Sequence, residues 1–363
     1  MNTLHKHLLV LGGLLGLLLF SCLVLWLRSS LHPQVWQPSS SPGLSGVFTA
    51  NNYLHTNYLT SLSVGNGPED ITFDKEGNLY TALASGDILK LIFDNNAFTS
   101  PTIIANTGGR PLGLKFNADG NLIVADAIKG LLEVTLMGDV NTLVDNYAAE
   151  PLRFVDHLVI AQSGVIYFSD ASTRFTIENY KYDFIEASQT GRVFAYDPSL
   201  DSLTLLVDDV FFANGVALSK DERFLLINET GKARILRYDL HGGAGEGATV
   251  FVDNLPGLPD NLVWGTDGII WVALISLRDP LLDGLAEKTL LRTLLGGLPH
   301  SWLPEGKHYG LVLGLDEDGR VLHNLQTADG YTQITTAISR NKKLYLGSLH
   351  QDHVGVVDIK NLQ

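Results

Sequence analysis

Short strands in which apolar and polar positions alternate recur along the chain from Tyr53 onward. Each copy starts with a small polar cluster, continues as an apolar strand, turns at Asp or Gly, and ends with a second strand that finishes in small or polar residues. Such period-two alternation between turn residues predicts paired β-strands rather than helices. Six copies align: GPEDITFDKEGNLYTALAS from Gly67, RPLGLKFNADGNLIVADA from Arg110, FVDHLVIAQSGVIYFSDAS from Phe154, FANGVALSKDERFLLINET from Phe212, LPDNLVWGTDGIIWVALIS from Leu258 and TAISRNKKLYLGSLH from Thr336.

The spacing of the copies, about 40 to 75 residues, is typical of four-stranded propeller blades with inserted loops. Because one blade cannot bury both of its faces alone, the blades must stack on one another. The sequence therefore predicts an all-β fold, a six-bladed β-propeller. We expect the segment from about Tyr53 to Ser63 to pair with the last blade and close the ring, which removes exposed strand edges.

One segment does not follow this repeated strand pattern. Leu281 to Leu298 places leucines at helical spacing among charged residues, which predicts a short amphipathic helix inserted in the fifth blade. Such a helix could cap the central channel or touch a membrane surface. The alternative is an ordinary helix packed on the rim of the propeller.

The N-terminus predicts a membrane anchor. Leu8 to Leu27 is an uncharged apolar run between Lys6 and Arg28, long enough for a helix that spans a bilayer. A cleaved signal peptide is the alternative, but the run is longer than a usual signal core and no small-residue cleavage site follows it. The short leading tail and the large folded remainder favour a single-pass protein with its propeller outside the cytoplasm, in a periplasmic, extracellular or lumenal space.

The predicted organisation is an anchor over residues 1–28, a linker over 29–52 and the propeller over 53–363. The linker assignment rests on its Ser and Pro content and on the absence of either strand or helix periodicity.

Composition narrows the function classes. Of the 363 residues, 45% are hydrophobic and only 18% are charged, and there are 36 glycines, as expected for many short strands joined by tight turns. The net charge of −14 argues against a nucleic-acid partner, which needs a basic surface. Cys22 is the only cysteine and lies in the apolar run, so neither an intrachain disulfide nor a cysteine metal site can form.

Polar residues stand at equivalent positions just before the first strand of several copies, where they converge on one end of a propeller channel. Oxygen donors from four separate blades are the ligands that calcium prefers, so we predict a calcium site; capping of turns is the alternative for each residue taken singly. The predicted ligands are Glu69, Asp156, Asn214, Asp260 and Asn261. The ends of the second strands supply further polar candidates, namely Asp126, Asp170, Glu229 and His350.

The runs GRPLGLKFNADGNLIVADA, GVIYFSDAS, GRVFAYDP, FFANGVALSKDERFLLINET, NLPGLPDNL and LYLGSL closely resemble the strictosidine synthase-like and adipocyte plasma membrane-associated protein family. The resemblance covers nearly the whole chain. That family is grouped with paraoxonases and gluconolactonases, so the resemblance implies a six-bladed propeller with calcium in the channel and hydrolysis of esters, lactones or phosphotriesters. By motif, its channel ligands fall on Glu69, Asn214 and the pair Asp260–Asn261, while Asp156 stands where the family usually has asparagine.

Three departures from the family pattern limit what can be carried over. Leu112 replaces a paraoxonase histidine, and Ser339 replaces the glutamate of true strictosidine synthases, so we do not expect strictosidine synthesis. The second, structural calcium of the paraoxonases would use Asp70 and the position of His157, and we do not include that site in the prediction. One calcium ion is therefore expected.

Two functions remain open from the sequence. The first is a calcium-dependent arylesterase or lactonase acting on small, fairly apolar molecules, with Asp260 as nucleophile or base and His350 as acid or base. The second is a non-catalytic binding or adhesion propeller with a structural calcium. The membrane, through the N-terminal helix, and a small ester or lactone are the predicted partners.

Overall fold

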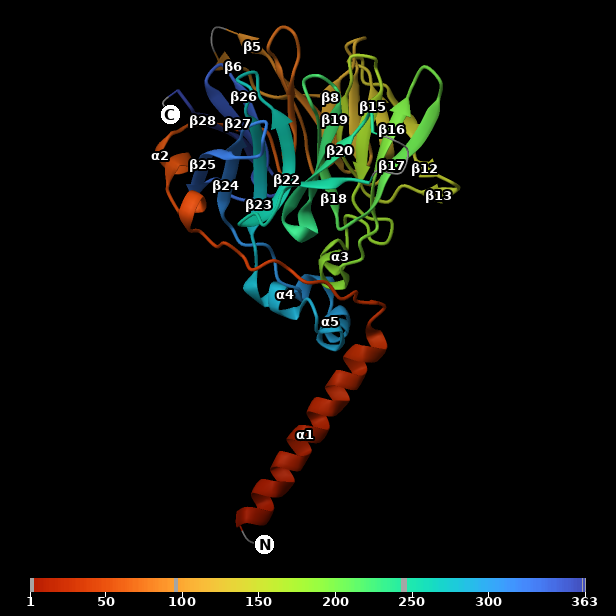
Figure 1. Ribbon diagram of the computed structural model, residues 1–363, viewed down its shortest axis with the longest axis vertical. Helices are drawn as coiled ribbons and strands as arrows, with labels where there is room; N and C mark the ends of the chain where they lie inside the picture. Colours follow the sequence, from red (N-terminus) through yellow and green to blue (C-terminus); the bar gives the residue numbers. More distant parts are fainter. Residues whose placement is uncertain (1–2, 95–96, 243–246, 361, 363) are drawn as a thin grey trace. The chain divides into compact units, whose positions relative to one another are not determined.

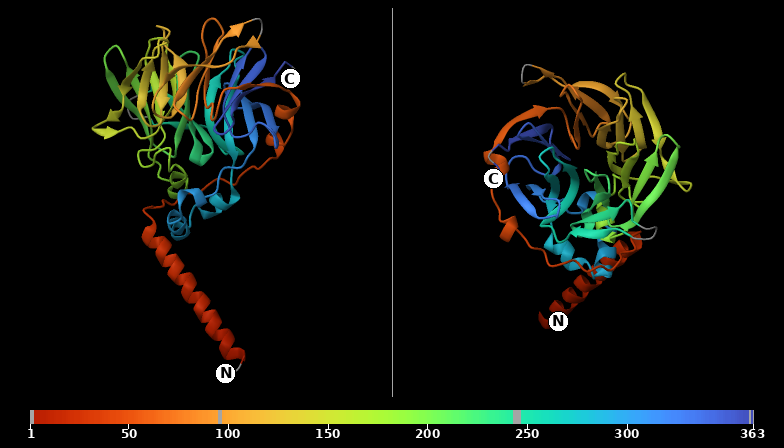
Figure 2. Two further views of the ribbon diagram at one scale, coloured as in Figure 1. Left: turned by 180° about the vertical axis from the view of Figure 1, so that it is seen from behind. Right: turned by 45° about the horizontal axis from the view of Figure 1, so that its top comes forward.

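The computed structural model describes residues 3–94, 97–242, 247–360 and 362. It confirms the six-bladed propeller: six four-stranded antiparallel sheets surround a common centre, as the right-hand view of Figure 2 shows. Helices are few, and α1 (Thr3–Arg28) is the long one at the N-terminus in Figure 1.

Each blade is an antiparallel sheet in which the innermost strand comes first, except that the sixth blade takes its outermost strand from the N-terminus. Blades 1 to 3 consist of β2 (Ile71–Phe73), β3 (Leu79–Ala82), β4 (Asp87–Leu91) and β7 (Thr102–Asn106); β8 (Pro111–Phe116), β9 (Leu122–Asp126), β10 (Gly130–Val134) and β11 (Val140–Val144); β14 (Val155–Ile160), β15 (Ile166–Asp170), β16 (Gly191–Asp197) and β17 (Ser202–Val210). Blades 4 to 6 consist of β18 (Ala213–Leu218), β19 (Phe224–Glu229), β20 (Arg234–Asp239) and β21 (Thr249–Val252); β22 (Gly257–Trp264), β23 (Ile270–Leu277), β24 (Gly310–Leu315) and β25 (Val321–Thr327); β26 (Ile334–Arg340), β27 (Lys343–Ser348), β28 (His353–Asp358) and β1 (Tyr58–Ser63). Two small hairpins lie between strands, β5 (Phe93–Asp94) with β6 (Ala97–Phe98) and β12 (Asn146–Tyr147) with β13 (Glu150–Pro151).

The N-terminal strand closes the ring, as the sequence predicted. β1 pairs antiparallel with β28, with Ser63 opposite His353 and Tyr58 opposite Val357. Just before it, the short helix α2 (Tyr53–Thr56) buries Leu54 in the apolar cluster of the last two blades. The last blade is therefore built from both ends of the folded chain.

The cores lie between blades. One buried cluster joins Ala217 and Leu226 of blade 4 to Leu262 and Leu313 of blade 5, and comparable clusters occupy the other blade interfaces. Each innermost strand contacts the innermost strands of both neighbours, in the order β2, β8, β14, β18, β22, β26 and back to β2. This continuous ring of inner strands determines the positions of the residues that face the channel.

A β-bulge recurs near the start of the inner strands. In β14 the pairing shifts between Val155 and Leu158, in β18 between Ala213 and Val216, and β8, β22 and β26 carry equivalent shifts. A bulge leaves a residue unpaired and re-aims its side chain. In β14, β18 and β22 the bulged residues include the polar residues that the sequence placed before an apolar strand.

The chain divides into two compact units. The propeller unit contains residues 39–178, 189–278 and 306–363, and the helical unit contains residues 1–38, 179–188 and 279–305. The latter comprises α1, α3 (Lys181–Glu186), α4 (Pro280–Leu285), α5 (Thr289–Gly296) and the 3₁₀ turn η3 (His300–Trp302).

The predicted fifth-blade helix is two short helices. α4 begins at Asp279, whose carboxylate accepts the Leu281 N–H at 2.7 Å, with Pro280 as its first residue, a favourable helix start. α5 follows after a break. The Arg292 side chain, on α5, is buried and donates to the carbonyls of Gln34, Ile185 and Ala286, which ties the linker, α3 and α4 together. The α3 insertion, in blade 3, was not predicted.

Loss of the closing strand should prevent folding of the propeller. A chain that begins at Val64 lacks β1 and the buried Leu54, and it leaves the edge of β28 open to pairing with other molecules. We expect this chain to aggregate, whereas a chain that begins at Ser30 should stay soluble and melt cooperatively. Size-exclusion chromatography and near-ultraviolet circular dichroism would measure this. A soluble, cooperatively melting Val64 chain would show that β1 is dispensable.

Candidate functional site

Four of the five predicted ligands lie in bulges of the inner strands, and the fifth lies just before an inner strand. Asp156 lies in the β14 bulge, Asn214 in the β18 bulge, and Asp260 with Asn261 in the β22 bulge, while Glu69 comes two residues before β2. All five are between 2% and 5% exposed. These residues are called the channel set below.

Four oxygens of the channel set lack partners. Asp156 Oδ1, Asn214 Oδ1, Asp260 Oδ1 and Asn261 Oδ1 are buried and accept no hydrogen bond within the described part of the chain. Buried carboxylate and amide oxygens normally have partners, because an unsatisfied buried polar group costs about 1–3 kcal/mol. Four such oxygens from three neighbouring blades fit a group that is bound in addition to the protein.

Polar side chains of adjacent blades fix the backbone of the channel set. Asn228 Nδ2 donates to the Asp260 carbonyl at 2.6 Å, and Thr335 Oγ1 donates to the Glu69 carbonyl at 2.7 Å. A Cβ at Gly215 would lie 2.6 Å from the Asp260 carbonyl oxygen, so the β18 bulge rests directly on the β22 bulge. The side chains are thus held on a rigid ring rather than on loose loops.

Glu69 has an arginine partner. Arg110, which is 7% exposed, donates from Nη2 to Glu69 Oε2 at 2.8 Å and from Nη1 to the Gly67 carbonyl at 3.2 Å. The guanidinium fixes one oxygen of the carboxylate and leaves the other for a ligand. Partners of this kind orient metal-binding carboxylates.

The three carboxyl groups of the channel set repel one another. Burial, chiefly, raises the pKa of Asp156 and of Asp260 well above its ordinary value, and the Glu69 charge raises both further. Burial also raises the pKa of Glu69 from 4.5 to about 7, although Arg110 acts in the opposite direction. Ionisation of all three is therefore disfavoured, because Arg110 supplies only one positive charge to offset burial and mutual repulsion.

Calcium fits this donor set. All its donors are hard oxygens, as calcium prefers, and they come from separate rigid strands. In the described residues, no three His, Cys, Asp or Glu side chains are grouped so as to hold a metal ion by themselves. The three carboxylates of the channel set are thus not grouped closely enough to hold an ion alone, and a bound ion would also need the amide oxygens of Asn214 and Asn261.

Comparisons with known proteins agree with this fold and these motifs. The sequence pattern of strictosidine synthase matches residues 156–243, and the pattern of the N-terminal part of strictosidine synthase-like proteins matches residues 46–91. Strictosidine synthase-like protein 6 of Arabidopsis thaliana is 30% identical over 357 residues, covering 94% of this chain and 95% of that protein. Adipocyte plasma membrane-associated protein of Salmo salar is 33% identical over 383 residues, covering 98% of this chain and 90% of that protein. The chain belongs to the strictosidine synthase-like family.

Solved structures share the fold of this strictosidine synthase-like protein. A putative gluconolactonase superimposes with a TM-score of 0.57 at 15% identity, covering 86% of this chain and 97% of that one. Regucalcin of Agrobacterium tumefaciens, described as a calcium-binding protein, gives a TM-score of 0.57 at 15% identity, covering 83% and 91%. At this level of identity the likeness shows the propeller fold.

The carboxylates at the ends of the second strands have a structural role in this family member. Asp126 Oδ1 accepts the Arg110 N–H at 3.0 Å, and Asp170 Oδ1 accepts the Phe154 N–H at 2.9 Å. Glu229 accepts the Phe211 N–H at 3.0 Å in the same way. Each carboxylate ties the end of a second strand to the segment that leads into the first strand of its blade, so these three are not part of the channel set.

His350 lies elsewhere. It is exposed and follows β27, in a turn where Gln351 accepts the Gly67 N–H at 2.8 Å. An added Cβ at Gly67 would lie 2.9 Å from the Leu349 carbonyl oxygen and 3.1 Å from Arg110 Nη2. The His350 turn therefore borders the Arg110 side of the site, but its side chain is not buried with the channel set.

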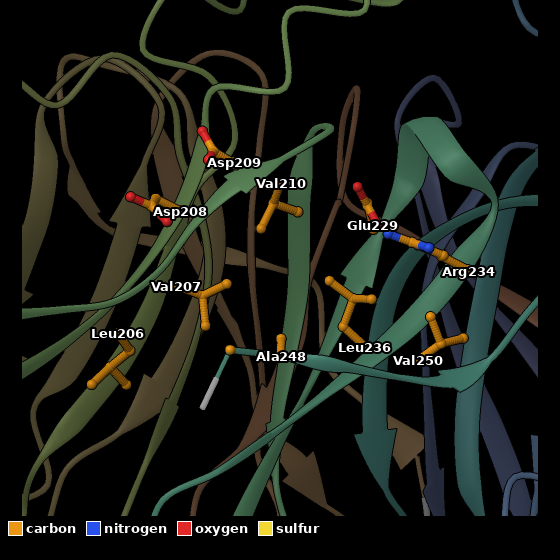
Figure 3. A pocket seen from close by; sticks show the side chains of 11 residues that line it. Leu206, Val207, Asp208, Asp209, Val210, Glu229, Arg234, Leu236, Ala248 and Val250 are labelled. Carbon is orange, nitrogen blue, oxygen red and sulfur yellow. Dashed lines mark hydrogen bonds and ion pairs between the residues drawn. The ribbon is translucent and has the colours of Figure 1, made fainter. Parts of the chain in front are cut away.

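Sequence reasoning missed Arg110 as a partner of Glu69. Its position gave no signal, because Arg110 opens its sequence copy two residues before Leu112, where the neighbouring copies have Gly67 and Phe154. A separate pocket of about 230 Å³ lies between blades 3 and 4 and is lined by Val207, Leu236, Val250 and other residues, with Glu229 beside Arg234 (Figure 3). It contains none of the channel set.

The raised pKa of Glu69 predicts a pH effect on the metal-free protein. A group whose pKa is higher in the folded state stabilises that state at low pH, and this contribution is lost as the pH rises from about 4.5 to about 7. Relative to Glu69→Gln, the wild type should therefore lose up to about 3 kcal/mol of unfolding free energy across this range.

Denaturant unfolding of both proteins, after removal of divalent metals, would measure this difference. The comparison cancels the contributions of buried histidines such as His157, whose pKa burial lowers and which titrate with the opposite sign. A difference that does not change with pH would show that Glu69 is ionised without a bound cation.

Proposed function

We propose that this protein is a calcium-dependent hydrolase of small esters or lactones, with its active site at the channel set. The unpartnered oxygens of Asp156, Asn214, Asp260 and Asn261, beside Glu69, carry the proposal. Two fold neighbours support it by what they are described to be, a putative gluconolactonase and the calcium-binding protein regucalcin.

The chemistry is divided among named groups. The bound ion would supply a Lewis acid that polarises the carbonyl oxygen of the substrate. Arg110 orients the Glu69 carboxylate, and side-chain hydrogen bonds from Asn228 and Thr335 to main-chain carbonyl groups hold the backbone of Asp260 and Glu69 in place. Asp260, which the positive charge of the ion would keep ionised, would accept the proton of an attacking water.

One observation favours the second candidate, a binding propeller with a structural calcium. His350 is exposed, and Leu112 occupies the inner-strand position of the β8 bulge, so that blade presents an apolar side chain there. Proton transfer to the leaving group would then depend on His350 or on solvent. Measurement of turnover separates the two candidates.

Calcium-dependent turnover is expected with phenyl acetate or an aliphatic lactone. Chelation should abolish it, and Asp260→Asn should lower kcat/KM by about 10²–10⁴-fold because it removes the proposed base and a carboxylate ligand. Asp318→Asn, on an exposed turn, is the matched control and should retain full activity. No turnover together with calcium-dependent melting would instead support the binding propeller.

We further propose that α1 is a retained membrane anchor, with the propeller outside the cytoplasm. Its segment Leu11–Arg28 is long and apolar enough to cross a bilayer.

Within the helical unit, α5 packs on the end of this helix, since an added Cβ at Gly297 would overlap the Leu25 carbonyl oxygen. Exposed apolar side chains gather in the same unit, namely Leu281, Leu290, Leu291 and Trp302. We propose that these side chains bring α4 and α5 into contact with the membrane surface.

We therefore expect a fluorophore attached at position 290, in place of Leu290, to contact lipid. In a Cys22→Ser background, Leu290→Cys labelled with a polarity-sensitive dye should show blue-shifted emission that quencher-bearing lipids reduce. Leu200→Cys is the matched control, because Leu200 is 74% exposed against 65% for Leu290 but stands in a polar turn. The same aqueous emission at both sites would contradict membrane contact by α5.

A further inference from the structure

Asp70 neighbours Glu69 in sequence but has a complete set of polar partners. It is fully buried, and its Oδ2 accepts from Lys115 Nζ at 2.5 Å and from the Leu114 N–H at 3.1 Å. Its Oδ1 accepts from Thr336 Oγ1 at 3.2 Å. The two adjacent carboxylates thus differ, because Asp70 has an ammonium group beside it and the channel set has only Arg110.

The partners of Asp70 come from different blades. Lys115 lies on β8 of blade 2, His157 in the β14 bulge of blade 3, and Thr336 on β26 of blade 6. His157 Nδ1 accepts the Val216 N–H of blade 4 at 3.1 Å. Asp70, Lys115, His157 and Thr336, called the Asp70 cluster, therefore link blade 1 to four other blades around one buried charge.

The Asp70 cluster does not fit a metal ion. Since Val216 donates to Nδ1 of His157, a neutral ring carries its proton on Nε2, which lies 3.7 Å from Asp70 Oδ2. His157 thus presents a proton rather than a lone pair to Asp70. The Lys115 ammonium already lies at hydrogen-bond distance from the carboxylate, where a cation would bind.

We propose that Lys115 is a built-in cation that takes the place of a structural metal ion and lets the inner strands close around Asp70 without metal. A lysine ammonium carries the needed positive charge and donates up to three hydrogen bonds. Its side chain is 21% exposed, and its ammonium group reaches the fully buried carboxylate. This inference is independent of the proposed hydrolysis, because it concerns a different carboxylate and predicts stability rather than turnover.

Replacement of Lys115 tests the proposal in the full-length, detergent-solubilised protein. In chelator, Lys115→Met should lower the melting temperature by at least about 5 °C, because it leaves a buried carboxylate unpaired. Lys90→Met is the matched control: Lys90 lies 3.8 Å from Asp74, both on the first blade, and its removal should change melting little. Lys115→Met should then recover stability in millimolar calcium beyond the gain of the wild type, and it should retain more calcium per chain on equilibrium dialysis.

A Glu69→Gln background separates this result from the channel set, since the calcium response of Lys115→Met should persist when that site is weakened. The double variant Asp70→Asn with Lys115→Met removes both charges and should fold without any extra calcium response. If Lys115→Met melted in chelator at the same temperature as the wild type, the proposal would be overturned. A loss of stability or folding that calcium does not reverse would overturn it too, because the ammonium would then not stand in the place of a cation.

Discussion

The recurring β-bulge of the inner strands is the constraint on which the site depends. A regular inner strand would alternate its side chains between the two blade interfaces, both of which are apolar. The bulge breaks this alternation near the start of the strand and aims polar side chains at the channel instead. Neighbouring bulges then pack on one another, as at Gly215 and Asp260, so the polar residues sit on the most rigid part of the fold.

Electrostatics divides the channel into two parts. Burial alone would raise the pKa of Asp70, but Lys115 and His157 hold that pKa below its ordinary value. Burial raises the pKa of Glu69, Asp156 and Asp260, and Arg110 offsets this only in part. The charge of Asp70 is neutralised within the chain, whereas the carboxylates of the channel set have Arg110 alone as a counter-charge. The proposed calcium ion would supply the positive charge that this part lacks.

The strand pattern was predictable because period-two alternation between turn residues depends on local chemistry, and the repeated polar position before each strand identified the channel set. Lys115 and Arg110 could not be assigned in the same way. Each is a lone cation in or beside an alternating strand, where a solvated side chain is the ordinary interpretation, and only the closure of the ring brings its carboxylate partner near. The insertion that contains α3 was missed because its helix is only Lys181–Glu186, too short for a helical period to stand out.

The pairing of β1 with β28 has a consequence for biogenesis. Ser63 and His353 lie opposite each other in the sheet, yet the ribosome makes them about 15–60 s apart at synthesis rates of ~5–20 residues per second. During that interval β1 has no strand to pair with, although the apolar segment of α1 has already been synthesised. The ring cannot close until β28 has left the ribosome, so completion of the propeller waits for its last blade. A chain cut short before β28 would therefore leave the edge of β1 unpaired.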